Sequence, residues 1–193
     1  MSKVILFTLI SFFSVARMNA QRLPTVKMET RFGDILIEVD TLKAPLTAKN
    51  FLKHIQNRTY ENAVFYRVVR MDNQPDNKIK IEVIQGGLFD DERLEKIVPI
   101  EHETTQVTGL KHLNGTISMA RAEPGTASTE FFICVGDQPE LDFGGKRNPD
   151  GQGFAAFGQV VKGMKVVKKI QQQKDSGQML TEKVEINSIQ IIK

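Results

Sequence analysis

The chain of 193 residues contains no tryptophan and only one cysteine, and neither sign of charge dominates. Because Cys134 has no second cysteine to pair with, an intramolecular disulfide is excluded, and so is a small disulfide-stapled secreted domain. Two of the 26 basic residues, Lys3 and Arg17, lie within the first 20 residues, which contain no acidic residue. The rest therefore holds 24 basic and 23 acidic residues, a net charge of about +1, and we expect no nucleic-acid partner.

The common catalytic and cofactor motifs are also missing. We find no Ser-His-Asp pattern, no Cys-His pair and no dinucleotide fingerprint. The segment Glu101-His102-Glu103 suggests a metal site, but adjacent strand residues point to opposite faces and no second histidine follows at helical spacing. The segment Gly144-Gly145-Lys146 lacks the spacing and the Ser or Thr of a phosphate-binding loop. We therefore expect neither a metal nor a cofactor.

An apolar run, Val4–Ala16, follows Lys3 and is too short for a comfortable membrane span. A basic residue, an apolar run and small residues at its end and at Ala20 are typical of a secretory signal peptide. We expect residues 1–20 to be a signal peptide, with cleavage after Ala20 slightly preferred, and residues 21–193 to be one domain. An uncleaved N-terminal anchor is the alternative.

Export without disulfides suits the periplasm or cell envelope of a bacterium. The sequence has no cysteine near the predicted cleavage site, so a lipoprotein anchor is not indicated. We expect no stable membrane insertion after cleavage, and we expect a monomer.

The composition, 40% hydrophobic and 25% charged, is that of a globular domain with a substantial core. Alternating apolar residues predict strands in hairpin order, which favours a mainly antiparallel sheet or barrel. The predicted strands are Val26–Arg31, Asp34–Val39, Val64–Val69, Lys80–Gln85, Thr116–Arg121, Thr129–Val135, Phe154–Val161 and Val184–Ile192, with a short one near Val98–Ile100. Apolar stripes predict helices over Pro45–Arg58 and Met164–Gln173.

The predicted strand Thr129–Val135 is apolar on both faces apart from one charge. Alternation puts Glu130, Phe132 and Cys134 on one side of the strand, and Phe131 and Ile133 on the other. A strand with one face in solvent should alternate apolar and polar residues. Phe132 is therefore either ordinary core or the floor of a groove on the sheet.

Arg67 interrupts the apolar strand Val64–Val69, so it must be exposed, paired or functional. Alternation places it on the side of Phe65 and Val69, opposite Tyr66 and Val68.

Six short motifs carry the strongest signal. They are Phe65-Tyr66-Arg67-Val68-Val69, Val83-Ile84-Gln85-Gly86-Gly87, Gly115–Ala122, Ser128–Ile133, Leu141-Asp142, and Phe157-Gly158-Gln159-Val160 followed by Gly163-Met164. In this order they resemble the cyclophilin family of peptidyl-prolyl cis-trans isomerases, over roughly Val26 to Lys193. The resemblance implies a mainly β fold, a closed eight-stranded antiparallel β-barrel capped by two α-helices, with the active groove on its outer face.

The resemblance also assigns site residues. Arg67 matches the catalytic arginine, Gln85 the glutamine that supports it, and Phe132 the base of the proline pocket. The other substrate-binding positions that it implies are Val83, Ala120, Arg121, Ala122, Glu130, Leu141 and Phe154. Among these, Val83 and Leu141 match apolar walls, and Ala120 to Ala122 match the strand whose backbone receives the peptide.

The sequence departs from the family pattern at several positions. Glu82 stands where an aromatic is usual, and Phe154 stands where histidine or tyrosine is common. Glu130 replaces the usual glutamine, and an ion pair between Glu130 and Arg67 is the alternative to a catalytic Arg67. Glu140 takes the place of a tryptophan that contacts cyclosporin in sensitive members, so we expect weak cyclosporin binding.

The loops Met71–Lys78 and Gly144–Gly153 look extended, and we expect substrate access to differ from that of compact relatives.

The implied chemistry needs no nucleophile. Rotation about a peptide bond is opposed by about 18–20 kcal/mol, and an X–Pro bond interconverts in roughly tens to hundreds of seconds unaided. Lowering that barrier by about 3–7 kcal/mol gives an ordinary turnover rate. The expected function is peptidyl-prolyl isomerisation in proline-containing segments of unfolded or folding exported proteins. The alternative is a peptide-binding or chaperone module of the same fold with little catalytic activity.

Overall fold

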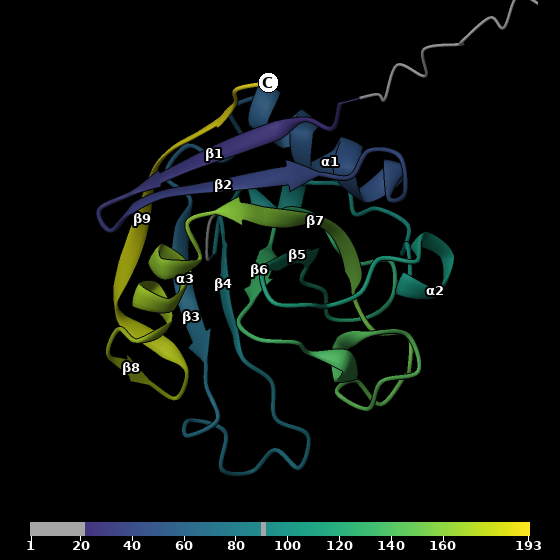
Figure 1. The fold of residues 1–193 in the computed structure, drawn as a ribbon, viewed down its shortest axis with the longest axis vertical. Coiled ribbons are helices and arrows are strands. Elements are labelled where there is room, and N and C mark those ends of the chain that lie inside the picture. Colours follow the sequence, from purple (N-terminus) through teal and green to yellow (C-terminus); the bar gives the residue numbers. More distant parts are fainter. Residues whose placement is uncertain (1–21, 90–91) are drawn as a thin grey trace, which may run out of the picture.

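The computed structural model describes residues 22–89 and 92–193, which form one closed β-barrel with helices packed against it (Figure 1). The predicted signal peptide, residues 1–20, lies outside the described residues. In the part of the chain that is described, every helix is too short or too polar to cross a membrane.

Nine strands lie in the described residues, and eight of them close the barrel. Their bounds are β1 Thr25–Thr30, β2 Gly33–Val39, β3 Val64–Val69, β4 Val83–Gly87, β5 Thr116–Met119, β6 Phe131–Cys134, β7 Ala155–Lys162, β8 Asp175–Ser176 and β9 Met179–Ile191. The strand order is β1-β2-β7-β5-β6-β4-β3-β9, and pairing of β9 with β1 closes the ring. The two-residue strand β8 pairs with β9. The predicted eight-stranded antiparallel barrel is therefore confirmed.

Both predicted helices are present. Helix α1 spans Pro45–Gln56 and packs against β7 and β9, and α3 spans Met164–Gln171 and packs against β2, β3 and β4. A third helix, α2 at Thr105–Thr108, was not predicted, because four residues are too few to show a helical period. Two short 3-10 turns, η1 at Leu94–Lys96 and η2 at Pro139–Leu141, complete the elements.

Glu103, which we considered as part of a metal site, caps α1 instead. The residue at the start of this helix, Ala44, has no side chain that can accept a hydrogen bond. The Glu103 carboxylate accepts the backbone N–H of Leu46 at 3.1 Å and that of Thr47 at 2.6 Å. The negative charge at the helix N-terminus also suits the helix dipole.

The predicted strand Lys80–Gln85 is wrong at both ends, since β4 runs from Val83 to Gly87. The backbone of Ile81 is occupied by a side chain: its N–H donates to Gln74 Oε1 at 3.3 Å and its carbonyl accepts Gln74 Nε2 at 2.8 Å. At the other end, Gly86 continues the ladder and pairs with Phe131. A Cβ on Gly86 would lie 2.8 Å from the Val64 carbonyl oxygen, so glycine permits this close pairing.

The expected short strand near Val98–Ile100 reduces to an isolated bridge between Ile100 and Ala127.

The two faces of β6 serve two separate apolar clusters. Phe131 and Ile133 point into the barrel core, where the Phe131 ring lies 5.8–5.9 Å from the rings of Phe51, Tyr60 and Phe65. Phe132 on the opposite face belongs to a smaller cluster, which we call the outer cluster. Its buried members are Val69, Ile81, Val83, Phe132, Cys134 and Leu141. The predicted alternation along β6 is confirmed.

Alternation fails in β3, where the register shifts between Phe65 and Arg67 in the pairings with both β4 and β9. Phe65 and Val68 therefore lie in the barrel core, while Val69 joins the outer cluster. The prediction that Phe65 shares a face with Arg67 is wrong, because a bulge places one extra residue between them.

Candidate active site on the outer face of the barrel

A pocket of about 230 Å³ opens beside the outer cluster. It is lined by Arg67, Ile81, Val83, Gln85, Ala120, Arg121, Phe132, Leu141, Arg147, Asn148 and Phe154. The structure thus brings together every predicted site residue except Ala122 and Glu130. Sequence reasoning missed Ile81, Arg147 and Asn148, and the last two lie in the extended loop Gly144–Gly153.

The base of the pocket is apolar. Phe132 is only 4% exposed, and the walls Val83 and Leu141 are buried beside it. The Phe154 ring meets Phe132 edge-on, with centroids 5.2 Å apart and planes at 86°. This answers the question that the sequence left open: Phe132 is the floor of a groove, and a small apolar ring such as that of proline matches it chemically.

A buried polar chain supports Phe132 from behind. The His112 ring stacks on Phe132 at 5.9 Å with 16° between the planes. Its Nδ1 lies 2.8 Å from Asp142 Oδ1, and its Nε2 lies 3.0 Å from Ser118 Oγ. Burial opposes ionisation of Asp142, but the hydrogen bonds from His112 outweigh it and hold the pKa of that carboxyl below its usual range.

Although the sequence shows no Ser-His-Asp pattern, the fold brings Ser118, His112 and Asp142 together in one hydrogen-bonded chain. Ser118 lies in β5, His112 in the segment before β5 and Asp142 directly after η2, so spacing along the chain does not reveal them. Because Ser118 is 0% exposed, it cannot reach a substrate, and the arrangement holds the Phe132 ring rather than supplying a nucleophile.

Two amide side chains fix the guanidinium of Arg67. Its Nη1 donates to Gln85 Oε1 at 2.8 Å, and its Nε and Nη2 donate to Gln178 Oε1 at 3.1 and 2.6 Å. Burial lowers the pKa of Arg67, but an arginine remains protonated even so. The result is a fixed, charged donor beside an apolar floor.

Gln178, which sequence reasoning missed, comes from the tight turn between β8 and β9. It adopts a left-handed backbone conformation, with φ at 74°. Its backbone N–H donates to Asp175 Oδ2 at 3.0 Å, and its Nε2 donates to the Asn73 carbonyl at 3.2 Å. The turn therefore aims the Gln178 side chain oxygen at Arg67.

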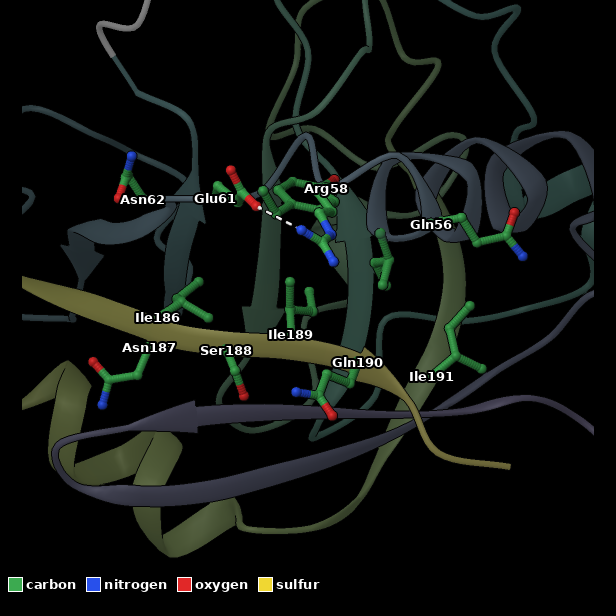
Figure 2. Close-up of a pocket in the computed structure, with 12 residues that line it drawn as sticks. Gln56, Arg58, Glu61, Asn62, Ile186, Asn187, Ser188, Ile189, Gln190 and Ile191 are labelled. Atoms are coloured by element: carbon green, nitrogen blue, oxygen red, sulfur yellow. Dashed lines mark ion pairs between the residues drawn. The ribbon is translucent and has the colours of Figure 1, made fainter.

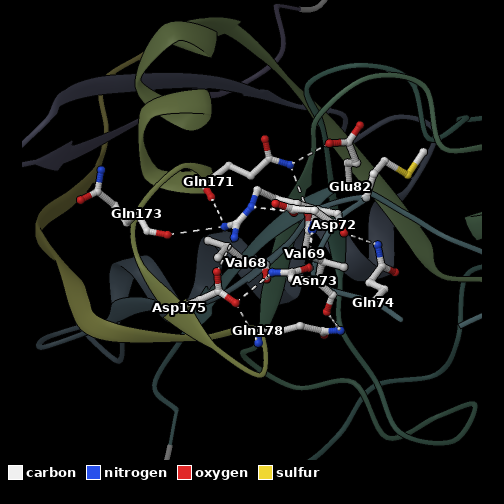
Figure 3. A network of polar contacts seen from close by, with 12 residues as sticks. Val68, Val69, Asp72, Asn73, Gln74, Glu82, Gln171, Gln173, Asp175 and Gln178 are labelled. Atoms are coloured by element: carbon white, nitrogen blue, oxygen red, sulfur yellow. Dashed lines mark hydrogen bonds and ion pairs between the residues drawn. The ribbon is translucent and has the colours of Figure 1, made fainter. Parts of the chain in front are cut away.

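Asp175 anchors this turn to the rest of the barrel (Figure 3). Its carboxylate accepts Asn73 Nδ2 at 3.0 Å and forms an ion pair with Arg70. Arg70 Nη1 in turn donates to the Gln171 carbonyl at 2.8 Å, at the end of α3. The support of Arg67 thus extends through three separate segments of the chain.

Glu130 does not pair with Arg67, so the alternative of an ion pair is wrong. The Glu130 carboxylate accepts the backbone N–H of Leu88 at 2.8 Å and that of Phe89 at 3.3 Å, away from the pocket. A Cβ on Gly87 would overlap this carboxylate, so glycine makes the space that it occupies. Burial raises the pKa of Glu130 above its ordinary value.

Replacing Glu130 by glutamine is expected to stabilise the protein at neutral pH. A carboxyl whose pKa is higher in the folded state contributes its stability below its unfolded pKa and loses it as the pH rises through the folded value. Since glutamine keeps one acceptor oxygen and never ionises, the stability of the Glu130→Gln variant relative to the wild type should increase as the pH rises above about 4, near the unfolded pKa, and should level off once the pH exceeds the raised pKa of the folded state. Melting temperatures across that range measure this. The exposed control Glu123→Gln should show no such trend, and a Glu130→Gln gain that grows toward acid pH would contradict the expectation.

Strand β5 ends at Met119, two residues before the predicted Arg121, and the segment that follows it beside the pocket leaves a backbone N–H available. The N–H of Ala120 donates to the Glu130 carbonyl at 2.8 Å, and that of Ala122 donates to Thr126 Oγ1 at 3.1 Å. Within residues 22–89 and 92–193, the Arg121 N–H has no acceptor. An extended peptide can therefore pair with the backbone at Arg121, whereas Ala122 does not line the pocket.

A wider hollow of about 740 Å³ lies elsewhere, between the end of α1 and β9 (Figure 2). Arg58 and Glu61 on its rim form an ion pair at 4.0 Å, so their opposite charges offset each other. Among the residues that line this hollow, no fixed and unbalanced charge lies beside an apolar floor. The smaller pocket around Arg67 and Phe132 is the better candidate because it has both.

Comparisons with known proteins point in the same direction. The family model described as cyclophilin type peptidyl-prolyl cis-trans isomerase/CLD matches residues 25–191. The chain is 35% identical to peptidyl-prolyl cis-trans isomerase A of Dickeya dadantii, over 89% of this chain and 86% of that protein. It is 38% identical to peptidyl-prolyl cis-trans isomerase B of Escherichia coli, over 75% of this chain and 82% of that protein.

Solved structures are similar in fold. A cyclophilin type peptidyl-prolyl cis-trans isomerase of Cryptosporidium parvum aligns with a TM-score of 0.70 at 20% identity, covering 89% of this chain and 98% of that chain. A second structure of that protein, in the presence of the dipeptide Ala-Pro, aligns with a TM-score of 0.69 at 21% identity, covering 88% and 99%.

Proposed function

The chain belongs to the cyclophilin type peptidyl-prolyl cis-trans isomerases, and we propose that it isomerises X–Pro bonds in the pocket around Arg67. The observation that carries this site assignment is the guanidinium of Arg67, fixed by Gln85 and Gln178 beside the apolar floor Phe132.

The residues of the pocket suit the barrier of the reaction. The peptide bond resists rotation because the nitrogen lone pair is delocalised into the carbonyl. As the bond twists, the proline nitrogen pyramidalises and becomes a hydrogen-bond acceptor, so an Arg67 N–H binds the twisted form more strongly than the planar form. Phe132, Val83 and Leu141 hold the proline ring and exclude the water that favours the planar amide.

The substrate backbone is proposed to lie along the segment that follows β5, at Arg121. An extended peptide there donates and accepts main-chain hydrogen bonds, as an added strand does. The Ala-Pro dipeptide in the Cryptosporidium parvum structure supports a proline-containing ligand for this fold. The departures Glu82 and Glu130 would favour the alternative, a peptide-binding module with little catalytic activity, only if they altered the pocket, and neither residue lines it.

The site assignment is tested by exchange NMR on a short X–Pro peptide with isotope-labelled protein. We expect accelerated cis-trans exchange, with the largest amide shifts at Arg121, Phe132 and Gln85. Acceleration accompanied by shifts confined to the hollow between α1 and β9 would place the reaction elsewhere.

We further propose that the protein is exported and acts on proline-limited folding of exported proteins in the periplasm or cell envelope of a bacterium. The supporting observation is the leader pattern of Lys3, an apolar run and Ala20.

Fractionation of cells that express the full chain tests the export, together with N-terminal sequencing of the product. We expect the chain in the periplasmic fraction, starting at Gln21. A Val4→Arg/Leu9→Arg variant, with a disrupted apolar run, should stay inside the cell at full length. An intact N-terminus in the membrane fraction would support the uncleaved anchor, and an intact soluble chain in the cytoplasm would contradict export.

A further inference from the structure

We propose that the pocket prefers substrates that carry a carboxylate next to proline, and that Arg147 determines this preference. The preference presupposes that the pocket is the isomerisation site proposed above. It concerns a residue of the extended loop Gly144–Gly153, outside the motifs that assigned the other site residues.

The charges that line the pocket are all positive. Its charged residues are Arg67, Arg121 and Arg147, and no aspartate or glutamate lines it. The charge of Arg121 is balanced, because its Nη1 and Nη2 lie 2.8 and 3.0 Å from the carboxylate oxygens of Asp150. Arg67 and Arg147 donate only to neutral amides and carbonyls, so their charges are not balanced within residues 22–89 and 92–193.

Arg147 is held in place by the other extended loop. Its Nη1 donates to the Ile79 carbonyl at 2.6 Å and to Gln74 Oε1 at 3.2 Å. Gln74 is 1% exposed and is itself fixed by the Arg70 and Ile81 carbonyls. The two loops that the sequence marked as extended thus meet at this arginine, and they fix its guanidinium at the edge of the pocket.

The remaining donors of Arg147 are available to a ligand. An arginine has five N–H donors in a planar fork, and in Arg147 those on Nε and Nη2 have no acceptor among the described residues. A carboxylate matches a pair of such donors with two oxygens.

The proximity of Arg67 adds to the attraction for an anion. Burial lowers the pKa of the Arg147 guanidinium, and the positive charge of Arg67 lowers it further. Two like charges that share a partly dehydrated pocket repel each other, and a carboxylate between them relieves that repulsion. A substrate lysine in the same place increases the repulsion.

Peptides that differ only beside proline test this preference. We would measure kcat/KM by exchange NMR for peptides with Glu, Gln or Lys immediately before proline, and for a second series with these residues immediately after it. In at least one series the wild type should favour Glu over Lys by about tenfold, the usual effect of a charge-assisted hydrogen bond. Raising the salt concentration should reduce the ratio.

Three variants separate charge from structure. Arg147→Gln should lower the Glu-to-Lys ratio toward one, whereas Arg147→Lys, which keeps the charge but loses the planar pair of donors, should give an intermediate ratio. Lys146→Gln is the matched control, because it removes the same charge from the neighbouring exposed residue, and its ratio should equal that of the wild type.

Each outcome bears on one of the two proposals. Equal turnover of Glu and Lys peptides by the wild type would overturn the preference and leave the isomerase site intact. The preference would also be overturned if Arg147→Gln slowed the turnover of all peptides by the same factor. Arg147 would then only hold the two loops together. Failure to accelerate any X–Pro peptide would contradict the proposed function itself.

Discussion

Replacing Arg67 by alanine is expected to lower kcat/KM for an X–Pro peptide by about 10²–10³-fold, the usual effect of removing one preorganised donor to the transition state. The guanidinium is fixed by Gln85 and Gln178 before any substrate binds, so little reorganisation opposes its contact with the twisted bond. Most of the loss should appear in kcat, because the interaction is strongest when the bond is twisted. A protease-coupled assay that cleaves only the trans isomer measures it.

Arg67→Lys is the informative control for this prediction. Lysine keeps the positive charge but cannot donate to Gln85 and Gln178 through one planar fork. We expect it to recover only part of the activity, which would show that the fixed geometry matters beside the charge. Wild-type rates in Arg67→Ala would contradict the assignment of this residue.

Replacing Phe131 by alanine is expected to destabilise the protein by about 3–5 kcal/mol, the range for a large aromatic removed from a core. Its ring is 0% exposed and contacts three other aromatic rings inside the barrel. For a chain of this length the melting temperature should fall by about 10 °C. Activity measured well below the new melting temperature should change little, since Phe131 faces away from the pocket.

Phe132→Ala, one residue along the same strand, is the matched comparison. Its ring borders the open pocket, so we expect a smaller fall in melting temperature and a loss of kcat/KM of at least about tenfold. Calorimetry and the isomerase assay on both variants separate the two effects. If Phe131→Ala lost more activity than Phe132→Ala at the same fraction folded, the division of β6 into a core face and a pocket face would be wrong.

The strands were largely predictable because apolar residues recur at every second position of a strand that has one buried face. β1, β2 and β3 lie within one residue of the predicted bounds, or match them. Prediction failed where a distant group decides the backbone. The start of β4 is set by the Gln74 side chain, which occupies the backbone of Ile81. The face of β3 on which Phe65 lies is set by a β-bulge, and no pattern in the neighbouring sequence indicates that bulge.

The pocket was predictable to the extent that its residues lie in recognisable motifs. Arg67, Gln85 and Phe132 do, and the structure brings them together. Gln178 lies 111 residues from Arg67 along the chain and shows only a turn signal, the preceding Gly177. Arg147 lies in a loop whose sequence gives no sign of its neighbours. Contacts that depend on two loops meeting cannot be derived from the pattern of either.

The seam between β1 and β9 has a consequence for the timing of folding. Val26 pairs with Ile191 and Met28 with Ile189, so the barrel cannot close until β9 has emerged from the ribosome. β9 also pairs with β3, so a nascent chain without it leaves two strands with an open edge. Such long-range pairing makes folding slow. Until β9 emerges, the exposed edges of β1 and β3 can pair with strands of other chains, so this stage of synthesis is the one most prone to aggregation.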